Sequence, residues 1–473
     1  MESVAAGMQR LEALATSPVV ELLASAFRDA GQELALVGGP VRDAFLGRAV
    51  SDLDFTTSAR PDEILAIVTP ISETQWDIGR DFGTIGALVR GEPVEITTYR
   101  ADAYDGETRK PLVEFGESLE GDLARRDFSV NALALRLPER ILVDPSGGME
   151  DLIASRLRTP GPAEVSFGDD PLRMMRAARF TSQLEFTATP ETIEAMTALA
   201  PRIEIVSVER ISAELSKLLL TERPRAGIQL LVDTGLAAIV VPEIPALRLE
   251  IDEHAHHKDV YEHSLTVLDQ AIGYEKSRGH QPDLVLRLAS LLHDIGKPST
   301  KRVEPRGVVS FHHHDVVGGK LAARRLTALR FDKETTAAVA KLIELHLRFF
   351  GYSEGVWTDS AVRRYVRDAG PLLERLHILT RADVTTRNRR KADQLGFAYD
   401  DLEHRIAEIA EAEGLAAVRP ELDGEQIMRI LDLKPGREVG EAYRFLLDLR
   451  LDEGPLGEAE AERRLREWWA ERT

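Results

Sequence analysis

Residues 36–57, which read LVGGPVRDAFLGRAVSDLDFTT, constrain the fold of this chain more than any other stretch. The pattern predicts a strand, a turn at two glycines, a short helix and a second strand that ends in Asp52-Leu53-Asp54. Because strand side chains alternate between faces, we expect Asp52 and Asp54 to project to the same side. Two carboxylates held in this way can share a pair of divalent cations, which clamp the attacking and leaving oxygens of a phosphoryl transfer.

Two more features of this stretch suit a phosphate group. Gly38 and Gly39 let the backbone approach a phosphate closely, because neither residue has a Cβ. Arg42 follows one helical turn later and can donate a fork of hydrogen bonds to phosphate oxygens. A bare Asp-x-Asp is also typical of a solvated turn, but its combination with the glycines and the arginine favours a nucleotide site.

Residues 36–57 closely resemble the signature of the class II tRNA nucleotidyltransferase and bacterial poly(A) polymerase superfamily. Members of this superfamily carry a polymerase-β-like palm at the N-terminus. The resemblance implies Mg2+ on Asp52 and Asp54, and nucleotide contacts at Gly39 and Arg42.

The composition bounds what else the chain can be. With 473 residues, 43% of them apolar and 29% charged, it is predicted to be a soluble globular protein of two to four domains. The absence of cysteine leaves histidine and carboxylate as metal ligands and is consistent with a cytoplasmic protein. No apolar run of 18 residues is present, so we expect no membrane span. The net charge of −19 argues against broad nucleic-acid binding, so an RNA partner must meet local basic clusters and no DNA partner is expected.

The order of predicted elements indicates an α+β fold class in four parts. Short strands and helices alternate up to about residue 145, whereas most of the remainder reads as helices of period 3.6. Nine of the twelve histidines fall between His254 and His314, which predicts a boundary near residue 248. We expect a polymerase-β-like nucleotidyltransferase α/β head at 1–150, then an all-α neck at 151–247, a histidine-rich domain at 248–390 and a helical tail at 391–473.

Three segments of the head extend the resemblance. The strand VEITTYR carries Glu95, which is either a third carboxylate beside the aspartate pair or a solvent-facing strand residue. The polar, glycine-rich segment 101–121 resembles the flexible loop that is present in complete CCA-adding enzymes and missing from those that add only CC. In RRDFSVNALAL, which begins at Arg125, the resemblance implies that Arg126 and Asp127 contact triphosphate and ribose. The alternative is an exposed basic turn.

DDPLRMMRAARF, which begins at Asp169, contains a polar row. Asp170, Arg173, Arg176 and Arg179 recur at a spacing of three, so they are neighbours on one slowly drifting face of a helix. Asp170 followed by Pro171 is also a good N-cap and N1 pair, which would leave the arginines solvated.

The functional interpretation of this row rests on hydrogen-bond complementarity. A carboxylate accepts from the exocyclic amine of cytosine or adenine, and an adjacent arginine donates to the neighbouring ring acceptor. Uracil and guanine present a carbonyl oxygen in place of the amine. The motif resembles the acid-Asp-x-x-Arg template of class II CCA-adding enzymes, and the resemblance carries over to Asp170 and Arg173. Asp169 stands where the family often has glutamate.

The histidine-rich domain contains VYEHSL, LLHDIGKP, FHHHD, LIELH and TRADVTT. This pattern resembles the HD superfamily of metal-dependent phosphohydrolases. The resemblance implies metal ligands at His263, His293, Asp294 and Asp383, with His314 and His346 as additional ligands or phosphate contacts. Histidine and carboxylate ligands suit a divalent Mg, Mn, Ni, Fe or Zn ion. The alternatives are hydrogen-bonded core histidines, or a domain that only supports tRNA binding.

Taken together, these motifs predict CCA addition to tRNA 3′ ends, with CTP, ATP and Mg2+ and with release of pyrophosphate. A poly(A) polymerase is the close rival, although WDIGRDFGTIGAL places Asp81 where those enzymes usually carry a basic motif. The rival of another class is a metal phosphohydrolase whose N-terminal domain only binds RNA, and the intact Asp52/Asp54 pair argues against it.

Overall fold

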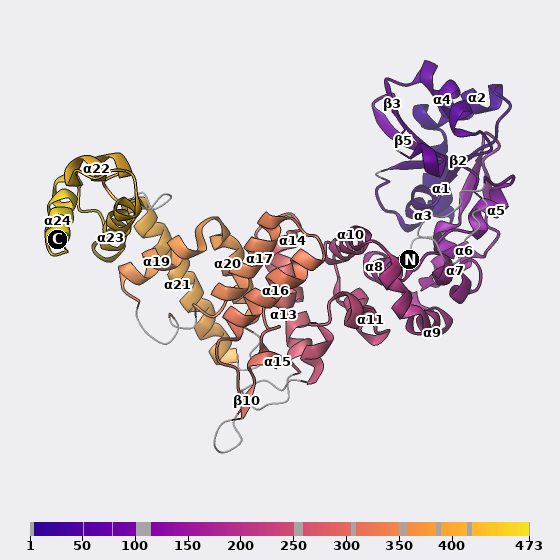
Figure 1. Cartoon of the computed structure of the whole chain (residues 1–473). Helices are drawn as coiled ribbons and strands as arrows, with labels where there is room; N and C mark the ends of the chain where they lie inside the picture. The colour runs from indigo at the N-terminus through magenta and orange to yellow at the C-terminus, as the bar shows by residue number, and fades with distance from the viewer. Residues whose placement is uncertain are drawn as a thin grey trace. The chain divides into compact units, whose positions relative to one another are not determined.

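The computed structural model describes residues 4–50, 52–77, 79–100, 115–249, 259–303, 309–349, 352, 357–384, 389–413 and 419–472 (Figure 1). The chain divides into two compact units, Met1–Pro242 and Glu243–Thr473. The boundaries of the four predicted domains are finer than this division and stay predictions. Residues 101–114 of the predicted loop lie outside the described residues.

The first unit contains a seven-stranded sheet in the order β3-β4-β5-β2-β1-β6-β7. Neighbouring strands are antiparallel except for β2 and β5, which are parallel and pair Asp54 with Glu95. The aspartate pair lies at the beginning of β2, which starts at Leu53, and the prediction that it ends a strand is wrong. The strands are β1 (Leu34–Val37), β2 (Leu53–Thr57), β3 (Thr74–Trp76), β4 (Thr84–Val89), β5 (Glu92–Thr98), β6 (Ala134–Leu137) and β7 (Ile141–Val143).

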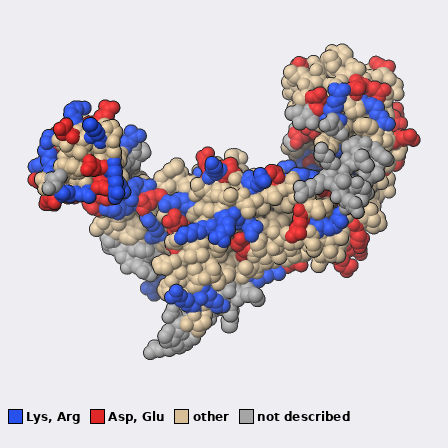
Figure 2. Space-filling model, in the orientation of Figure 1, with Lys and Arg blue, Asp and Glu red and all other residues tan. Residues whose placement is uncertain are grey.

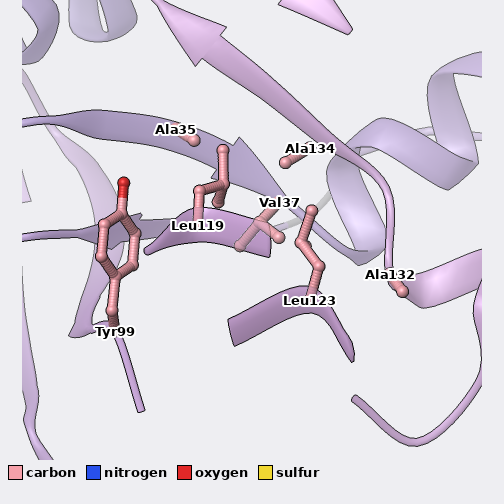
Figure 3. Packing of buried hydrophobic residues seen from close by; sticks show 7 residues of the cluster. All are labelled: Ala35, Val37, Tyr99, Leu119, Leu123, Ala132 and Ala134. Atoms are coloured by element: carbon pink, nitrogen blue, oxygen red, sulfur yellow. The ribbon is translucent and has the colours of Figure 1, made fainter. Parts of the chain in front are cut away.

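A small buried cluster joins the centre of this sheet to a helix (Figure 3). Leu119 and Leu123 lie four residues apart on α5, so they share one face and both contact this cluster. Val37 of β1 and Ala134 of β6 are the residues that the sheet contributes to this cluster, together with Ala35. The head helices are α1 (Val4–Ala15), α2 (Pro18–Asp29), α3 (Gly39–Leu46), α4 (Pro61–Val68), α5 (Leu119–Ala124) and α6 (Gly148–Ile153), with 3-10 turns at η1 (Thr69–Ile71), η2 (Arg80–Phe82) and η3 (Ser129–Asn131).

The rest of the first unit is built around α8, most of whose side chains are buried. Gly227 of α11 allows a close approach to α8, because a Cβ there would lie 2.2 Å from the carbonyl oxygen of Ala178. The elements are α7 (Ala163–Asp169), α8 (Leu172–Leu184), α9 (Pro190–Leu199), η4 (Ala200–Ile205), α10 (Val208–Leu219), α11 (Arg225–Asp233) and α12 (Leu236–Val240), with the short parallel strands β8 (Arg156–Leu157) and β9 (Thr187–Ala188).

The described residues of the second unit are helical apart from two short antiparallel strands. Its buried centre includes the ion pair of Arg287 with Glu275, in which Nη2 lies 2.7 Å from Oε2. Its elements are η5 (Pro245–Leu249), α13 (Val260–Ser277), α14 (Leu284–Leu292), α15 (Lys297–Thr300), β10 (Arg302–Val303), β11 (Val309–Ser310), α16 (His314–Ala328), α17 (Lys333–Leu345), α19 (Asp359–Ala369), η6 (Gly370–Leu372), α20 (Leu373–Asp383), α21 (Arg389–Glu413), α22 (Gly424–Leu431), α23 (Arg437–Glu453) and α24 (Glu458–Ala470).

The last three helices, α22 to α24, have a hydrophobic cluster of their own, to which Ile427, Leu446 and Leu465 belong. Over these helices, lysine and arginine atoms lie among aspartate and glutamate atoms on the face drawn in Figure 2. Across the described residues, no helix combines the length and the apolar character that a membrane crossing requires. The predicted fold class, an α/β nucleotidyltransferase head followed by helical parts, is confirmed.

Candidate functional sites

Three carboxylates gather where β2 begins. Asp52 precedes the strand, Asp54 lies within it, and the parallel register places Glu95 of β5 beside Asp54. Burial, then the negative charges of Glu95 and Asp52, raise the pKa of Asp54 to about 6, against the opposing effect of Arg126 and Arg42. The raised pKa shows that negative charge is concentrated here, and clustered carboxylate oxygens are the ligands that hard divalent cations prefer. The register therefore favours the interpretation of Glu95 as a third carboxylate.

An open cavity of about 350 Å³ lies in the same unit. Its volume is in the range of small-ligand pockets, and its lining has six arginines against three aspartates, so it suits a polyanion. Arg126 of this lining lies close enough to Asp54 to lower its pKa, which connects the cavity to the carboxylates. The lining residues are Thr97, Arg100, Asp122, Arg125, Arg126, Asp127, Asp170, Leu172, Arg173, Arg176 and Arg210.

Gly38, Gly39 and Arg42 form the turn that the sequence predicted. Gly38 has φ of +74°, a backbone conformation that favours glycine, and a Cβ there would lie 3.0 Å from Nη1 of Arg126. Arg42 is buried, and its Nε and Nη2 donate to the two carboxylate oxygens of Asp43, each at 2.9 Å. Its Nη1 donates to Oδ1 of Asn131 at 2.6 Å. These contacts tie the glycine turn to the 126–131 segment, and the predicted nucleotide contact of Arg42 stays a prediction.

Asp127 accepts hydrogen bonds on both of its oxygens. Oδ1 accepts from the backbone N–H of Phe128 at 2.8 Å and from Nδ2 of Asn131 at 2.9 Å. Oδ2 accepts from Nε of Arg176 at 2.7 Å. Burial alone would raise the pKa of Asp127, but Arg176 and Asn131 outweigh it and hold the pKa at about 2. The carboxylate is thus ionised at neutral pH and holds Arg176 at the cavity wall.

The members of the polar row separate in the structure, because Asp170 precedes α8 and the three arginines lie at successive positions along it. Arg173 lines the cavity and donates from Nη1 to Oγ of Ser166 at 2.8 Å and from Nη2 to the carbonyl oxygen of Arg125 at 2.7 Å. Arg179 is buried beside α10 instead, where its Nε donates to Oε2 of Glu214 at 2.6 Å. Three residues fall short of a full turn of 3.6, so each step rotates the row and the last arginine points away from the cavity.

Asp170 combines the two interpretations that the sequence left open. Its Oδ1 accepts from the backbone N–H of Leu172, the first residue of α8, at 3.2 Å, as a capping carboxylate does. Its Oδ2 lies 3.3 Å from Nη2 of Arg210 on α10. The same carboxylate lines the cavity with Arg173. Arg210 is half exposed at the cavity, so Oδ2 faces the space that a ligand can enter.

The sequence analysis did not single out several of the lining residues, including Asp122, Arg100 and Arg210. Asp122 stands four residues before Arg126, a helical ion-pair spacing that could have indicated it, and its Oδ2 lies 3.3 Å from Nη2 of Arg126. Arg100 follows β5, and its backbone N–H donates to Oδ1 of Asp122 at 3.1 Å. Arg210 lies 40 residues from Asp170 in the chain, and no local pattern indicates that pairing.

The second unit brings its histidines and aspartates together at the ends of helices. His263 lies in α13, His293 and Asp294 directly follow α14, and His314 begins α16. His346 directly follows α17, and Asp383 ends α20. Nε2 of His263 lies 2.9 Å from Oδ1 of Asp383 and 3.3 Å from Nε2 of His293. All four ligands that the resemblance implied are therefore adjacent.

The negative charges of the aspartates in this cluster favour a positive charge between them. Burial alone would lower the pKa of His293, but Asp294 and Asp383 outweigh it and raise the pKa to about 10. Burial and the charge of His293 lower the pKa of His346 to about 4. The aspartates thus stabilise a positive charge in the middle of the cluster, at the place where convergent imidazole and carboxylate groups would hold a divalent metal ion.

Three models of known protein families match this chain. The family model "Poly A polymerase head domain" matches residues 34–158, "Probable RNA and SrmB-binding site of polymerase A" matches 185–247, and "HD domain" matches 260–388. The fold and the carboxylate site define a nucleotidyltransferase that also carries an HD domain.

The chain belongs to the tRNA nucleotidyltransferase family, as its likeness to a relative of the same length shows. It is 35% identical over 448 residues to the A-adding tRNA nucleotidyltransferase of Deinococcus radiodurans, which covers 93% of this chain and 96% of the relative. It is 42% identical over 208 residues to the CCA-adding enzyme of Geobacillus thermodenitrificans, covering 44% of this chain and 50% of that enzyme. The structure of the Bacillus stearothermophilus CCA-adding enzyme with CTP matches with a TM-score of 0.70 at 25% identity, over 97% of this chain and 99% of that one. The predicted superfamily and the prediction of a nucleotidyltransferase are confirmed.

Proposed function

We propose that this enzyme adds C, C and A to the 3′ end of tRNA, with CTP and ATP as substrates and Mg2+ on Asp52 and Asp54, in the cytoplasm. The observation that carries the proposal is the cavity in which the pair Asp170 and Arg173 shares a wall with arginines, next to the carboxylates of β2. A site that transfers a nucleotide must hold the base and the triphosphate. In this cavity, Asp170 and Arg173 can hold the base and the other arginines can hold the triphosphate.

The reaction joins the 3′ oxygen of the tRNA to the α-phosphorus of the nucleotide, while the bond to the β-phosphate breaks and pyrophosphate leaves. When bound by the carboxylates, Mg2+ would activate the 3′ hydroxyl and neutralise negative charge on the phosphate. The arginines of the cavity neutralise the triphosphate and the departing pyrophosphate. Asp127 positions one of them, Arg176, through two hydrogen-bond distances of 2.7 and 2.6 Å from Nε and Nη2 to Oδ2.

The base is chosen by Asp170 and Arg173. Oδ2 of Asp170 faces the cavity and accepts the exocyclic amine of cytosine or adenine, while Arg173 donates to the adjacent ring nitrogen. UTP and GTP would set a carbonyl oxygen against the carboxylate, and two acceptors repel each other. Selection of C and A thus follows from the chemistry of two side chains and needs no nucleic-acid template.

A specific observation favours a narrower alternative. The relative that matches along 96% of its length is named for A addition only, whereas the CCA-adding relatives match over about half of their length. The deciding experiment offers the enzyme tRNA that ends before the CCA, after one C and after two C residues, with CTP and ATP singly and together. Addition of all three nucleotides supports our proposal. Addition of A alone to the tRNA that ends in CC would establish the narrower activity, and long A tails on unrelated RNA would establish a poly(A) polymerase.

We propose a second activity, the metal-dependent hydrolysis of phosphate esters, for the second unit. The observation that carries it is the buried cluster of histidines and aspartates at the ends of α14, α17 and α20. The test incubates the full chain with p-nitrophenyl phosphate and bis-p-nitrophenyl phosphate in the presence of Mn2+, Ni2+ or Mg2+. Hydrolysis that is lost in His293→Ala/Asp294→Ala supports the proposal, and the absence of hydrolysis with every metal contradicts it.

A further inference from the structure

An exposed tryptophan lies in the same row of the sheet as the carboxylates of β2. The register pairs Asp54 of β2 with Glu95 of β5, and Glu95 with Gly86 of β4. Gly86 in turn pairs with Trp76 of β3, the strand at the edge of the sheet (Figure 1). Residues that lie directly opposite each other on neighbouring strands point to the same face of a sheet, so all four share one face. Glu95 and Trp76 are exposed, so this face is open along the row.

Gly86 allows the indole of Trp76 to lie over the sheet. A Cβ on Gly86 would lie 1.9 Å from Nε1 and 2.1 Å from Cε2 of Trp76, so only a residue without a side chain leaves room for the ring. The indole therefore extends from the edge strand across β4, in the direction of Glu95. Because neighbouring strands lie about 4.8 Å apart, the ring is about one strand spacing from Glu95 and about two from Asp54.

The ring offers a flat surface to a ligand. It packs on Gly86, yet Trp76 as a whole stays 36% exposed. Nucleobases stack on exposed aromatic rings, and this contact tolerates any base because every base has a π-face. The position of this ring beside a nucleotide-transfer site therefore favours a base as its partner.

Trp76 lies outside the cavity that suits the incoming nucleotide. Thr97, two residues beyond Glu95 on the same face of β5, lines that cavity, whereas Trp76 is not part of the lining. In a phosphoryl transfer, the attacking and leaving oxygens lie roughly in line on opposite sides of the phosphorus. The acceptor that brings the attacking oxygen therefore needs its own place beside the carboxylates, and the indole provides a surface there.

We propose that the indole of Trp76 stacks the terminal base of the RNA acceptor and so places its 3′ hydroxyl beside Asp54. The proposal rests on the nucleotide addition proposed above and adds a residue that positions the acceptor. During CCA addition the terminal base changes at each step, and a stacking surface accepts every base. A hydrogen-bonding pair such as Asp170 and Arg173 selects between bases instead, which suits the incoming nucleotide.

The test uses the full chain with ATP and tRNA that ends in CC, a reaction that belongs to both CCA addition and the narrower A addition. A second acceptor lacks only its last base and keeps the ribose. In the parent protein, we expect kcat/KM for this acceptor to be about ten- to a hundredfold lower at saturating ATP. Trp76→Leu should show the same loss with the complete acceptor and little further loss with the other, while its KM for ATP stays unchanged.

Two further variants separate stacking from a general effect of mutation. Gly86→Ala displaces the ring and should behave as Trp76→Leu, whereas Trp76→Phe should keep most of the activity. Gln75→Ala is the matched control and should equal the parent protein, because this exposed residue lies on the same edge strand with its side chain on the opposite face.

A binding measurement without ATP tests the contact directly. The last base of the acceptor is replaced by 2-aminopurine, whose fluorescence falls when it stacks on an aromatic ring. We expect the parent protein and Gln75→Ala to quench this fluorescence, and Trp76→Leu to leave it close to the value of the free RNA.

Equal kcat/KM values of the parent protein and Trp76→Leu would overturn the proposal. Equal losses by this variant on both acceptors would overturn it too, because the ring would then serve only to cover Gly86. A higher KM for ATP without a change in kcat/KM for tRNA would show that the ring stacks the incoming base instead. If the parent protein added no nucleotide but its quenching of 2-aminopurine required Trp76, the proposed function would fail and the stacking contact would stand.

Discussion

Asp170 combines a structural contact with a proposed role in base recognition. Its Oδ1 accepts from the backbone N–H of Leu172, while its Oδ2 faces Arg210 and the cavity. Capping alone can be supplied by a serine, but a serine hydroxyl cannot replace a charged acceptor for a base amine. The two contributions are therefore separable by mutation.

We expect Asp170→Ser to keep the melting temperature and to lose base selection. A good base contact is worth about 1–3 kcal/mol, so the preference for CTP over UTP should fall about ten- to a hundredfold. The measurement is kcat/KM for CTP, ATP and UTP, with a melting curve on the same sample. Arg223→Ala is the control, since this exposed arginine pairs with Glu185 outside the cavity. Unchanged selectivity in Asp170→Ser would leave Asp170 as a cap only.

Our proposal makes nucleotide transfer depend on Asp54. Replacement by alanine removes one of the carboxylates at the beginning of β2, and with it a proposed ligand for Mg2+. We expect Asp54→Ala to abolish the addition of radiolabelled nucleotides to tRNA at saturating Mg2+, whereas hydrolysis by the second unit should persist. Near-native transfer by this variant would show that the cations are held elsewhere.

At the scale of elements, a chain of ion pairs fastens the head to the neck helices. Arg176 of α8 contacts Asp127 of the head, and Arg179 of α8 contacts Glu214 of α10. The folded-state pKa of Asp127, about 2, lies below the usual value of about 3.9. Its stabilising contribution is therefore complete above about pH 4 and is lost as the pH falls toward 2.

We expect Asp127→Asn to lower the free energy of unfolding by about 2–3 kcal/mol at pH 7, because a pKa shift of this size corresponds to that energy. The difference from the parent protein should be constant between pH 7 and 5 and should shrink between pH 4 and 3. Urea unfolding at each pH measures it. A difference that stayed constant down to pH 3 would contradict the charge as the cause.

The turn after α14 depends on a glycine where it meets α16. A Cβ on Gly296 would lie 2.1 Å from the carbonyl oxygen of His314, so alanine must push away the backbone of this predicted metal ligand. We expect Gly296→Ala to cost about 1–3 kcal/mol of stability and to weaken Mn2+ binding. Gly273→Ala in α13 is the matched control, because its Cβ would meet nothing within 4 Å. In this control, the free energy of unfolding should rise by up to about 1 kcal/mol. Equal melting temperatures of the two variants would refute the packing argument.

At the scale of the molecule, the two chemistries lie in separate compact units. The carboxylates and the cavity belong to Met1–Pro242, and the histidine cluster belongs to Glu243–Thr473. We expect His293→Ala/Asp294→Ala to lose hydrolysis of phosphate esters and to keep at least half of its nucleotide addition. Assays of both reactions on one preparation, with circular dichroism as the folding control, decide the point. Complete loss of nucleotide addition by a folded variant would show that the sites depend on each other.

The sequence alone determined the parts of this protein whose chemistry is local. The glycine turn, the Asp52/Asp54 pair, the Asp170/Arg173 pair and the His-Asp dipeptide each lie within a few residues, so their spacing in the chain already brings their members close together. The order of these motifs was enough to predict the family and the fold class.

Only the tertiary structure decided which distant residues meet. The neighbour of Asp54 is Glu95 because β2 and β5 are parallel and in that register, and Arg210 reaches Asp170 because α10 packs against α8. The potential metal ligands of the second unit come together because four helix ends converge around Asp294. The sequence pattern specifies that these segments bury one face, but the pairing of faces is settled by the packing of the whole chain, to which every residue contributes.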